Sequence, residues 1–128
     1  MKTLRKYSVI TITFIVLTIG CKRDNGVIPF VPVNFTINIH NPSYIDLNAV
    51  SGWTYVSGGS RGILIYRKSL DEFLTFDRHS TYDVTDGCQV AVDSTNLILV
   101  DDCSGSKFLI TDGSVLNGPA SVPLQQYN

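Results

Sequence analysis

Apolar and polar side chains alternate strictly between Val33 and His40, where the sequence reads VNFTINIH. Successive side chains of a strand point to opposite faces, so this period of two predicts a strand with one buried face. The NPS segment that follows, Asn41–Ser43, ends the strand, because proline cannot donate a backbone hydrogen bond and asparagine and serine favour turns. We expect the folded domain to begin at this strand.

Further short apolar segments follow, with turn residues between them. They predict strands at Ile63–Arg67, Phe73–Asp77, Cys88–Asp93, Leu97–Asp101 and Lys107–Thr111. Turns are expected at Gly58–Gly62, Ser94–Asn96 and Asp112–Ser114, and Tyr44–Tyr55 is expected to be irregular. No segment has helical spacing over three turns. Short strands at regular intervals are typical of an all-β antiparallel sandwich or small barrel, here as one domain over residues 33–128.

The first twenty residues have the pattern of an export signal. Lys2, Arg5 and Lys6 form a basic head, and the charge-free apolar segment Tyr7–Ile19 follows. This segment is shorter than the roughly 20 residues that a membrane span needs. It ends in LTIGC, which resembles the bacterial lipobox and implies lipidation of Cys21. The alternatives are an uncleaved N-terminal anchor, or ordinary secretion with an incidental cysteine.

A lipobox divides the chain into a signal peptide at 1–20, a lipidated N-terminus and tether at 21–32, and the domain at 33–128. Two acyl chains on Cys21 would hold the protein on a bilayer firmly. The expected location is therefore the bacterial cell envelope, facing the periplasm or the exterior. Lys22 after the cysteine favours the outer membrane, by analogy with other lipoproteins.

Charge and cysteine content narrow the function further. From Cys21 onward seven basic residues face eleven acidic ones, a net charge of −4, which argues against a nucleic-acid partner. If Cys21 carries lipid, Cys88 and Cys103 remain as a pair. Exported proteins meet an oxidising compartment, so a disulfide is expected between them. The alternative is two buried free thiols.

The segment CSGSKFLITDGSVLNGPASVPLQQY, residues Cys103–Tyr127, resembles the second half of a Rieske domain. That family reads C-P-x-C-H-G-S-x-F, then D-G-x-V, G-P-A, P-L and a final aromatic residue. An aromatic–Asp–Arg step before the first ligand loop is matched by Phe76–Arg78. Twelve residues of Cys103–Tyr127 match this family pattern in the same order: Gly105, Ser106, Phe108, Asp112, Gly113, Val115, Gly118, Pro119, Ala120, Pro123, Leu124 and Tyr127. The resemblance implies a Rieske-like fold and, in intact members, a [2Fe–2S] cluster.

All four cluster-ligand positions are changed. Ser80 and Tyr82 stand where the first loop has Cys and His, and Asp101 and Ser104 stand at the Cys and His positions of the second. A Rieske cluster needs two thiolates and two imidazoles, so we expect no cofactor and no resident metal. The alternative is a [2Fe–2S] electron-transfer protein with atypical ligands. The resemblance also implies that Cys103 pairs with a first-loop cysteine, for which Cys88 is the only candidate.

The remaining polar residues near these loops have simpler interpretations. His79 is expected to be a surface or loop histidine, and Asp101–Asp102 a solvated strand end. A weak metal-binding or hydrolytic centre of His79, Asp101 and Asp102 is a third hypothesis. Ser106 is expected to satisfy loop backbone groups. The leading hypothesis is a non-enzymatic scaffold or interaction protein that has an envelope protein as its partner.

Overall fold

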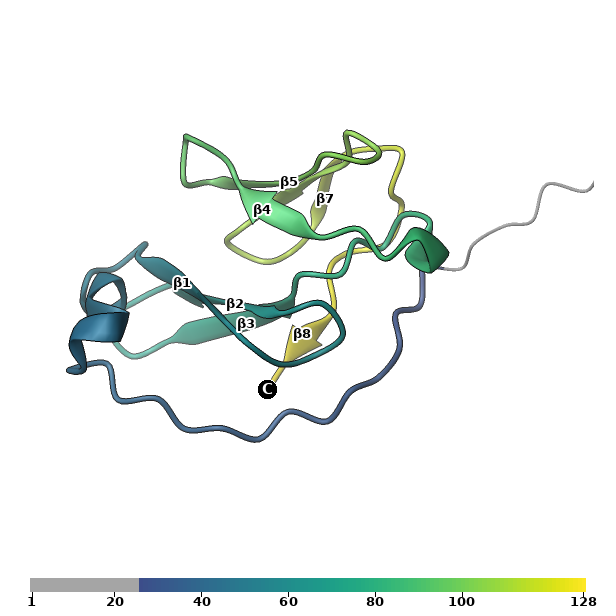
Figure 1. The fold of residues 1–128 in the computed structure, drawn as a ribbon. Helices are drawn as coiled ribbons and strands as arrows, with labels where there is room; N and C mark the ends of the chain where they lie inside the picture. Colours follow the sequence, from purple (N-terminus) through teal and green to yellow (C-terminus); the bar gives the residue numbers. More distant parts are fainter. Residues whose placement is uncertain (1–25) are drawn as a thin grey trace, which may run out of the picture.

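The computed structural model describes residues 26–128 and contains two four-stranded antiparallel sheets that face each other (Figure 1). The chain completes three strands of the first sheet, builds all of the second, and returns to add β8 beside β3. The expected antiparallel β sandwich is confirmed, and its sheets do not close into a barrel. The first sheet has the order β1 (Trp53–Val56), β2 (Ile63–Arg67), β3 (Phe73–Asp77) and β8 (Gln126–Tyr127). The second has β4 (Val90–Val92), β5 (Ile98–Asp101), β6 (Lys107–Leu109) and β7 (Val115–Asn117).

The strand pairs follow the predicted hairpins. Leu64 on β2 is opposite Phe76 on β3, and Val90 on β4 is opposite Asp101 on β5. The segment expected to be irregular instead holds the short 3-10 helix η1 (Pro42–Asn48) and β1. A proline in the first turn of η1 and an Asn41 side chain that accepts a hydrogen bond from the backbone N–H of Ser43 start this helix, as helix N-termini require.

The main core lies between the sheets. Leu64 and Phe76 from the first sheet meet Leu99 and Phe108 from the second, and all four are fully buried. The other buried members of this cluster are Tyr66, Leu74, Val90, Ile110, Ala120 and Leu124. This apolar contact holds the second sheet, and the loops at its end, against the first.

The strand predicted at Val33–His40 is absent from both sheets. These residues run extended across the outer face of the first sheet, as the blue segment of Figure 1 shows. Ile37 and Ile39 are half-buried there and pack against a cluster formed by Leu47, Ile63 and Ile65. The alternation therefore reflects burial on one side without strand pairing. Because both faces of the first sheet are covered, four consecutive residues of β2 are buried.

The N-terminal signal at 1–20, Cys21 and the start of the tether lie outside the described residues. Within residues 26–128, no helix has the length and apolar character needed to cross a bilayer. Gly26 and Ile28, from the part of the chain expected to be a tether, are buried. Contacts with the folded part thus extend back to Gly26.

Candidate functional site

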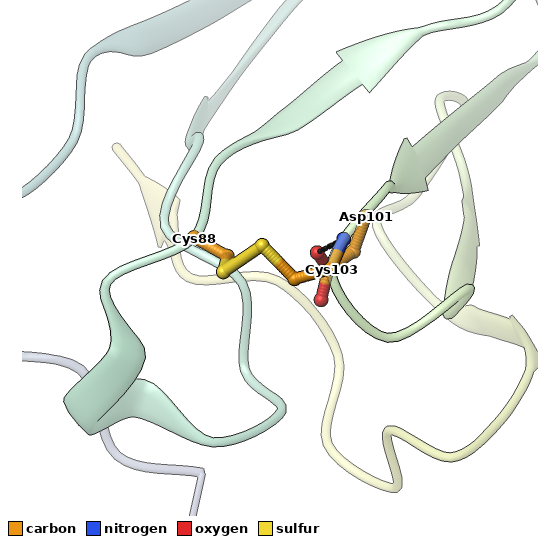
Figure 2. Close-up of side chains that lie close together, drawn as sticks. All are labelled: Cys88, Asp101 and Cys103. Atoms are coloured by element: carbon orange, nitrogen blue, oxygen red, sulfur yellow. Dashed lines mark hydrogen bonds between the residues drawn. A yellow bond between two sulfur atoms is a disulfide. The ribbon is translucent and has the colours of Figure 1, made fainter.

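Two loops that the resemblance assigns to a cluster are joined by a disulfide. The first loop follows β3, contains the short helix η2 (Val84–Asp86) and ends at Cys88; the second is the turn between β5 and β6. Cys88 and Cys103 are bonded with an S–S distance of 2.06 Å and a Cα–Cα distance of 6.4 Å (Figure 2). The predicted disulfide is confirmed, and the alternative of two buried free thiols is wrong.

A buried carboxylate at the end of β5 organises the second loop. Asp101 is fully buried, and its Oδ2 accepts hydrogen bonds from Ser80 Oγ at 2.6 Å and Ser104 Oγ at 2.7 Å. Its Oδ1 accepts from the backbone N–H of Cys103 at 2.9 Å, the dashed line in Figure 2. A buried carboxylate is costly unless it is hydrogen-bonded, and three donors meet that need here. The expectation of a solvated strand end is wrong for Asp101, whereas Asp102 is exposed.

Ser106 extends these contacts to the segment before β8. Its Oγ lies 2.8 Å from Ser104 Oγ and accepts from the backbone N–H of Ala120 at 2.9 Å. The expectation that Ser106 satisfies loop backbone is confirmed. We call Ser80, Asp101, Ser104 and Ser106 the polar network. Across residues 26–128, no buried side-chain nitrogen or oxygen lacks a hydrogen-bond partner.

Tyr82, the remaining one of the four expected ligand positions, is not part of the polar network. Its side chain is 42% exposed, and only its backbone N–H reaches the network, donating to Ser80 Oγ at 3.3 Å. The structure therefore brings together three of the four expected ligand positions, Ser80, Asp101 and Ser104. The hydroxyl groups of Ser80 and Ser104 both donate hydrogen bonds to the Asp101 carboxylate.

The donors at these positions do not fit an iron–sulfur cluster. Such clusters are held by thiolates, with imidazoles on one iron in the Rieske type, and the network offers only oxygen. The sulfurs of Cys88 and Cys103 lie with a carboxylate oxygen of Asp101 within 4.8 Å of one another. A cysteine binds a metal as its thiolate, however, and both sulfurs are joined in the disulfide.

His79 lies in the loop after β3, as one of the two expected placements has it, but it is buried, so the expectation of a surface position is wrong. Only 3% of it is exposed. Its Nε2 is 2.9 Å from the backbone oxygen of Val84, and its Nδ1 is 2.8 Å from Ser60 Oγ. A carbonyl can only accept, so Nε2 donates. Among the described residues, His79 does not join Asp101 and Asp102 in a group of potential metal ligands, so the metal-binding form of that hypothesis has no support in the geometry.

Asp77, whose role the sequence interpretation missed, forms a second buried polar centre. Its carboxylate accepts from the backbone N–H groups of Ser60 at 2.5 Å and Arg61 at 3.2 Å. It also accepts from the His79 N–H at 2.8 Å and from Tyr127 Oη at 2.7 Å. Burial and the adjacent Asp77 carboxylate raise the pKa of Tyr127 to about 12. The F-D-R step, noticed only as part of the resemblance, was the available signal.

The candidate site thus consists of the polar network, the adjoining disulfide and the Asp77 centre, which together fix the two loops to both sheets. No profile of a known protein family, no curated protein sequence and no solved structure matches the chain.

Proposed function

We propose that this chain is a Rieske-like domain without an iron–sulfur cluster, anchored in the bacterial cell envelope by lipid on Cys21, with a non-catalytic scaffold or interaction role. The observation that carries the proposal is the polar network. The resemblance assigns its members Ser80, Asp101 and Ser104 to three of the four positions at which the family binds its cluster, and both serines donate hydrogen bonds to Asp101.

The network and the disulfide would take over the structural role of a cluster. In a Rieske domain the metal centre links the two loops; here the hydrogen bond from Ser80 to Asp101 and the bond between Cys88 and Cys103 link them. Loops held in this way keep a fixed shape without metal, which suits a binding surface because little ordering is needed when a partner docks.

The charges and the burial of the serines support a non-enzymatic role. Ser80 and Ser106 are fully buried, so a substrate cannot reach their hydroxyls. The net charge of −4 from Cys21 onward favours a protein partner in the envelope over nucleic acid. The exposed rim of the two loops, which includes Tyr82, Asp102 and Cys103, is the surface we assign to that partner.

Iron content and the visible spectrum test the absence of a cluster. The full chain, purified in detergent, should be colourless and free of stoichiometric iron, whereas a [2Fe–2S] centre would absorb between about 400 and 600 nm. A coloured, iron-containing protein would establish the alternative, an electron-transfer protein with atypical ligands. A variant that combines Ser80→Cys, Tyr82→His, Asp101→Cys and Ser104→His is the matched positive control. Cluster binding by this variant alone would support the Rieske-like assignment of both loops.

The lipid anchor is tested separately. Labelled palmitate should be incorporated into the full chain in a bacterial host, and a Cys21→Ala variant should lose the label and leave the membrane fraction. A label that survives this substitution would refute lipidation of Cys21, and it would leave the argument about the cluster unchanged.

A further inference from the structure

An open pocket of about 520 Å³ lies beside the loop between β1 and β2, away from the polar network. Two arginines line it, Arg61 from this loop and Arg78 just after β3, together with the polar side chains of Ser57 and Gln89. The lining therefore combines two positive charges with neutral hydrogen-bonding groups.

The guanidinium of Arg78 is held in one orientation. Its central carbon lies 3.8 Å from the centroid of the Tyr55 ring, and its Nε donates to the backbone oxygen of Val90 at 3.0 Å. Stacking and this hydrogen bond fix the plane of the group. Neither terminal nitrogen of Arg78 has a hydrogen-bond acceptor or an ion-pair partner within residues 26–128.

Arg61 is exposed and lies against Gly87. A Cβ atom at Gly87 would come within 2.1 Å of Arg61 Nη2, so the absence of a side chain there makes room for the guanidinium. In the part of the chain that the structure describes, the Arg61 side chain has no hydrogen bond, and no carboxylate lies within 4.0 Å of it.

Two other basic side chains near the first sheet, unlike Arg61 and Arg78, have their charged groups bonded to acceptors of this chain. Arg67 donates to the backbone oxygens of Ser69, Leu47, Asn48 and Leu70. Lys68 pairs with Glu72 at 2.9 Å. Asp77 is the acidic group behind the pocket loop, but it is fully buried and already accepts from the backbone N–H groups of Ser60 and Arg61. Within residues 26–128, neither Arg61 nor Arg78 has a carboxylate within 4.0 Å, and the nearest acid in sequence to the Gly87 contact of Arg61 is the exposed Asp86.

We propose that this pocket binds a small polar molecule through an oxyanion group, a phosphate or a carboxylate. The guanidinium fork matches either group with paired N–H···O hydrogen bonds, which are stronger than neutral ones. The remainder of the ligand would lie beside Ser57 and Gln89, whose Nε2 already donates to the backbone oxygen of Arg61 at 2.6 Å. This inference is independent of whether the chain binds a cluster.

The test is a titration of the isotope-labelled full chain in detergent with inorganic phosphate and, separately, with acetate, followed by NMR. Chemical shifts should change at residues 57–62, 78 and 89 for at least one anion. Arg61→Gln should weaken binding about tenfold or more, the loss expected for a charge-assisted hydrogen bond. The tighter of the two anions identifies the group recognised.

Two further variants make the result specific. Lys68→Gln removes the same charge at the far end of β2 and should change affinity by less than about twofold, because exposed distant charges are screened. Arg78→Lys keeps the charge but loses the fork, and should weaken binding while leaving the spectrum of the fold intact. Absence of shifts in the pocket with both anions, or equal losses in Arg61→Gln and Lys68→Gln, would overturn the proposal.

Discussion

Ser80 and Asp101, 21 residues apart in the sequence, are joined by a 2.6 Å hydrogen bond between two fully buried side chains. The bond connects the same two loops as the disulfide between Cys88 and Cys103. One covalent and one polar cross-link thus act in parallel, and each can be removed separately.

Replacement of the buried carboxylate should destabilise the fold. In Asp101→Asn, an amide NH₂ replaces one of the two oxygens that now accept three hydrogen bonds. We expect the free energy of unfolding to fall by about 2 kcal/mol, the range for a lost hydrogen bond to a charged group. Urea denaturation measures this change. The exposed neighbour provides the control, since Asp102→Asn should stay within about 0.5 kcal/mol; equal effects at both positions would contradict the role given to Asp101.

Reduction of the disulfide should lower the free energy of unfolding more than the Asp101→Asn substitution does. The bond joins residues separated by 15 positions, and closing a loop of that length stabilises a fold by about 3 kcal/mol in the chain-entropy description. Urea unfolding with and without a dithiol reductant tests this. A chain that carries Cys88→Ser and Cys103→Ser should be as unstable as the reduced protein and insensitive to reductant. An unchanged midpoint after full reduction would show that the loops do not need the bond.

Stability should decline at alkaline pH because of Tyr127. Its pKa is raised to about 12 in the folded protein by burial and by Asp77, while an unfolded tyrosine ionises near pH 10. Between these values the unfolded chain loses a proton that the folded chain retains, so unfolding becomes more favourable as pH rises. The stabilisation is complete below about pH 10 and is lost through about pH 12.

The experiment compares thermal midpoints from pH 8 to 12 in the parent and in Tyr127→Phe. The phenylalanine variant starts lower, because it lacks the hydrogen bond to Asp77, but its midpoint should fall less steeply above about pH 10. Tyr82→Phe, which alters an exposed ring, should follow the parent. Parallel curves for the parent and Tyr127→Phe would rule out this source of the alkaline loss.

Alanine substitutions at two glycines should distinguish the cost of backbone strain from the cost of a packing clash. Gly105 and Gly113 both have positive φ, +78° and +73°. A Cβ at Gly105 would meet nothing within 4 Å, whereas one at Gly113 would lie 2.7 Å from Phe76 Cε1. Gly105→Ala should therefore cost only the left-handed penalty, about 1 kcal/mol. Gly113→Ala should cost about 2 kcal/mol more, because it also overpacks the core. Urea midpoints that do not differ would disprove the predicted clash.

The sequence predicted the strands whose apolar segments end in recognisable turns, but it misassigned Val33–His40. Alternation reports that one side of an extended chain is buried, and Ile37 and Ile39 are half-buried. Whether the backbone also pairs depends on a neighbouring strand edge, which local pattern does not encode. β1 was missed although Ser51–Gly52 is a turn signal directly before it and all four residues of Trp53–Val56 favour strands.

The site was predictable only in part, for a related reason. The cysteine count indicated the disulfide, and the resemblance placed Ser80, Asp101 and Ser104 near one another. The burial of His79 depends on Ser60 and Val84, which come from two different loops. Contacts of this kind depend on the tertiary arrangement, so they cannot be predicted from residue type or spacing along the chain.

The position of β8 has a consequence for the order of folding. Tyr127 bonds to Asp77 across 50 residues, so the first sheet is completed only by closing a long loop, and such non-local contacts slow folding. The disulfide lies inside that loop and shortens its effective length by its own span of 15 residues. Oxidation before sheet completion therefore lowers the entropy cost of the closure, by about 0.3 kcal/mol. Disulfide formation before β8 pairs with β3 would thus make that pairing modestly faster.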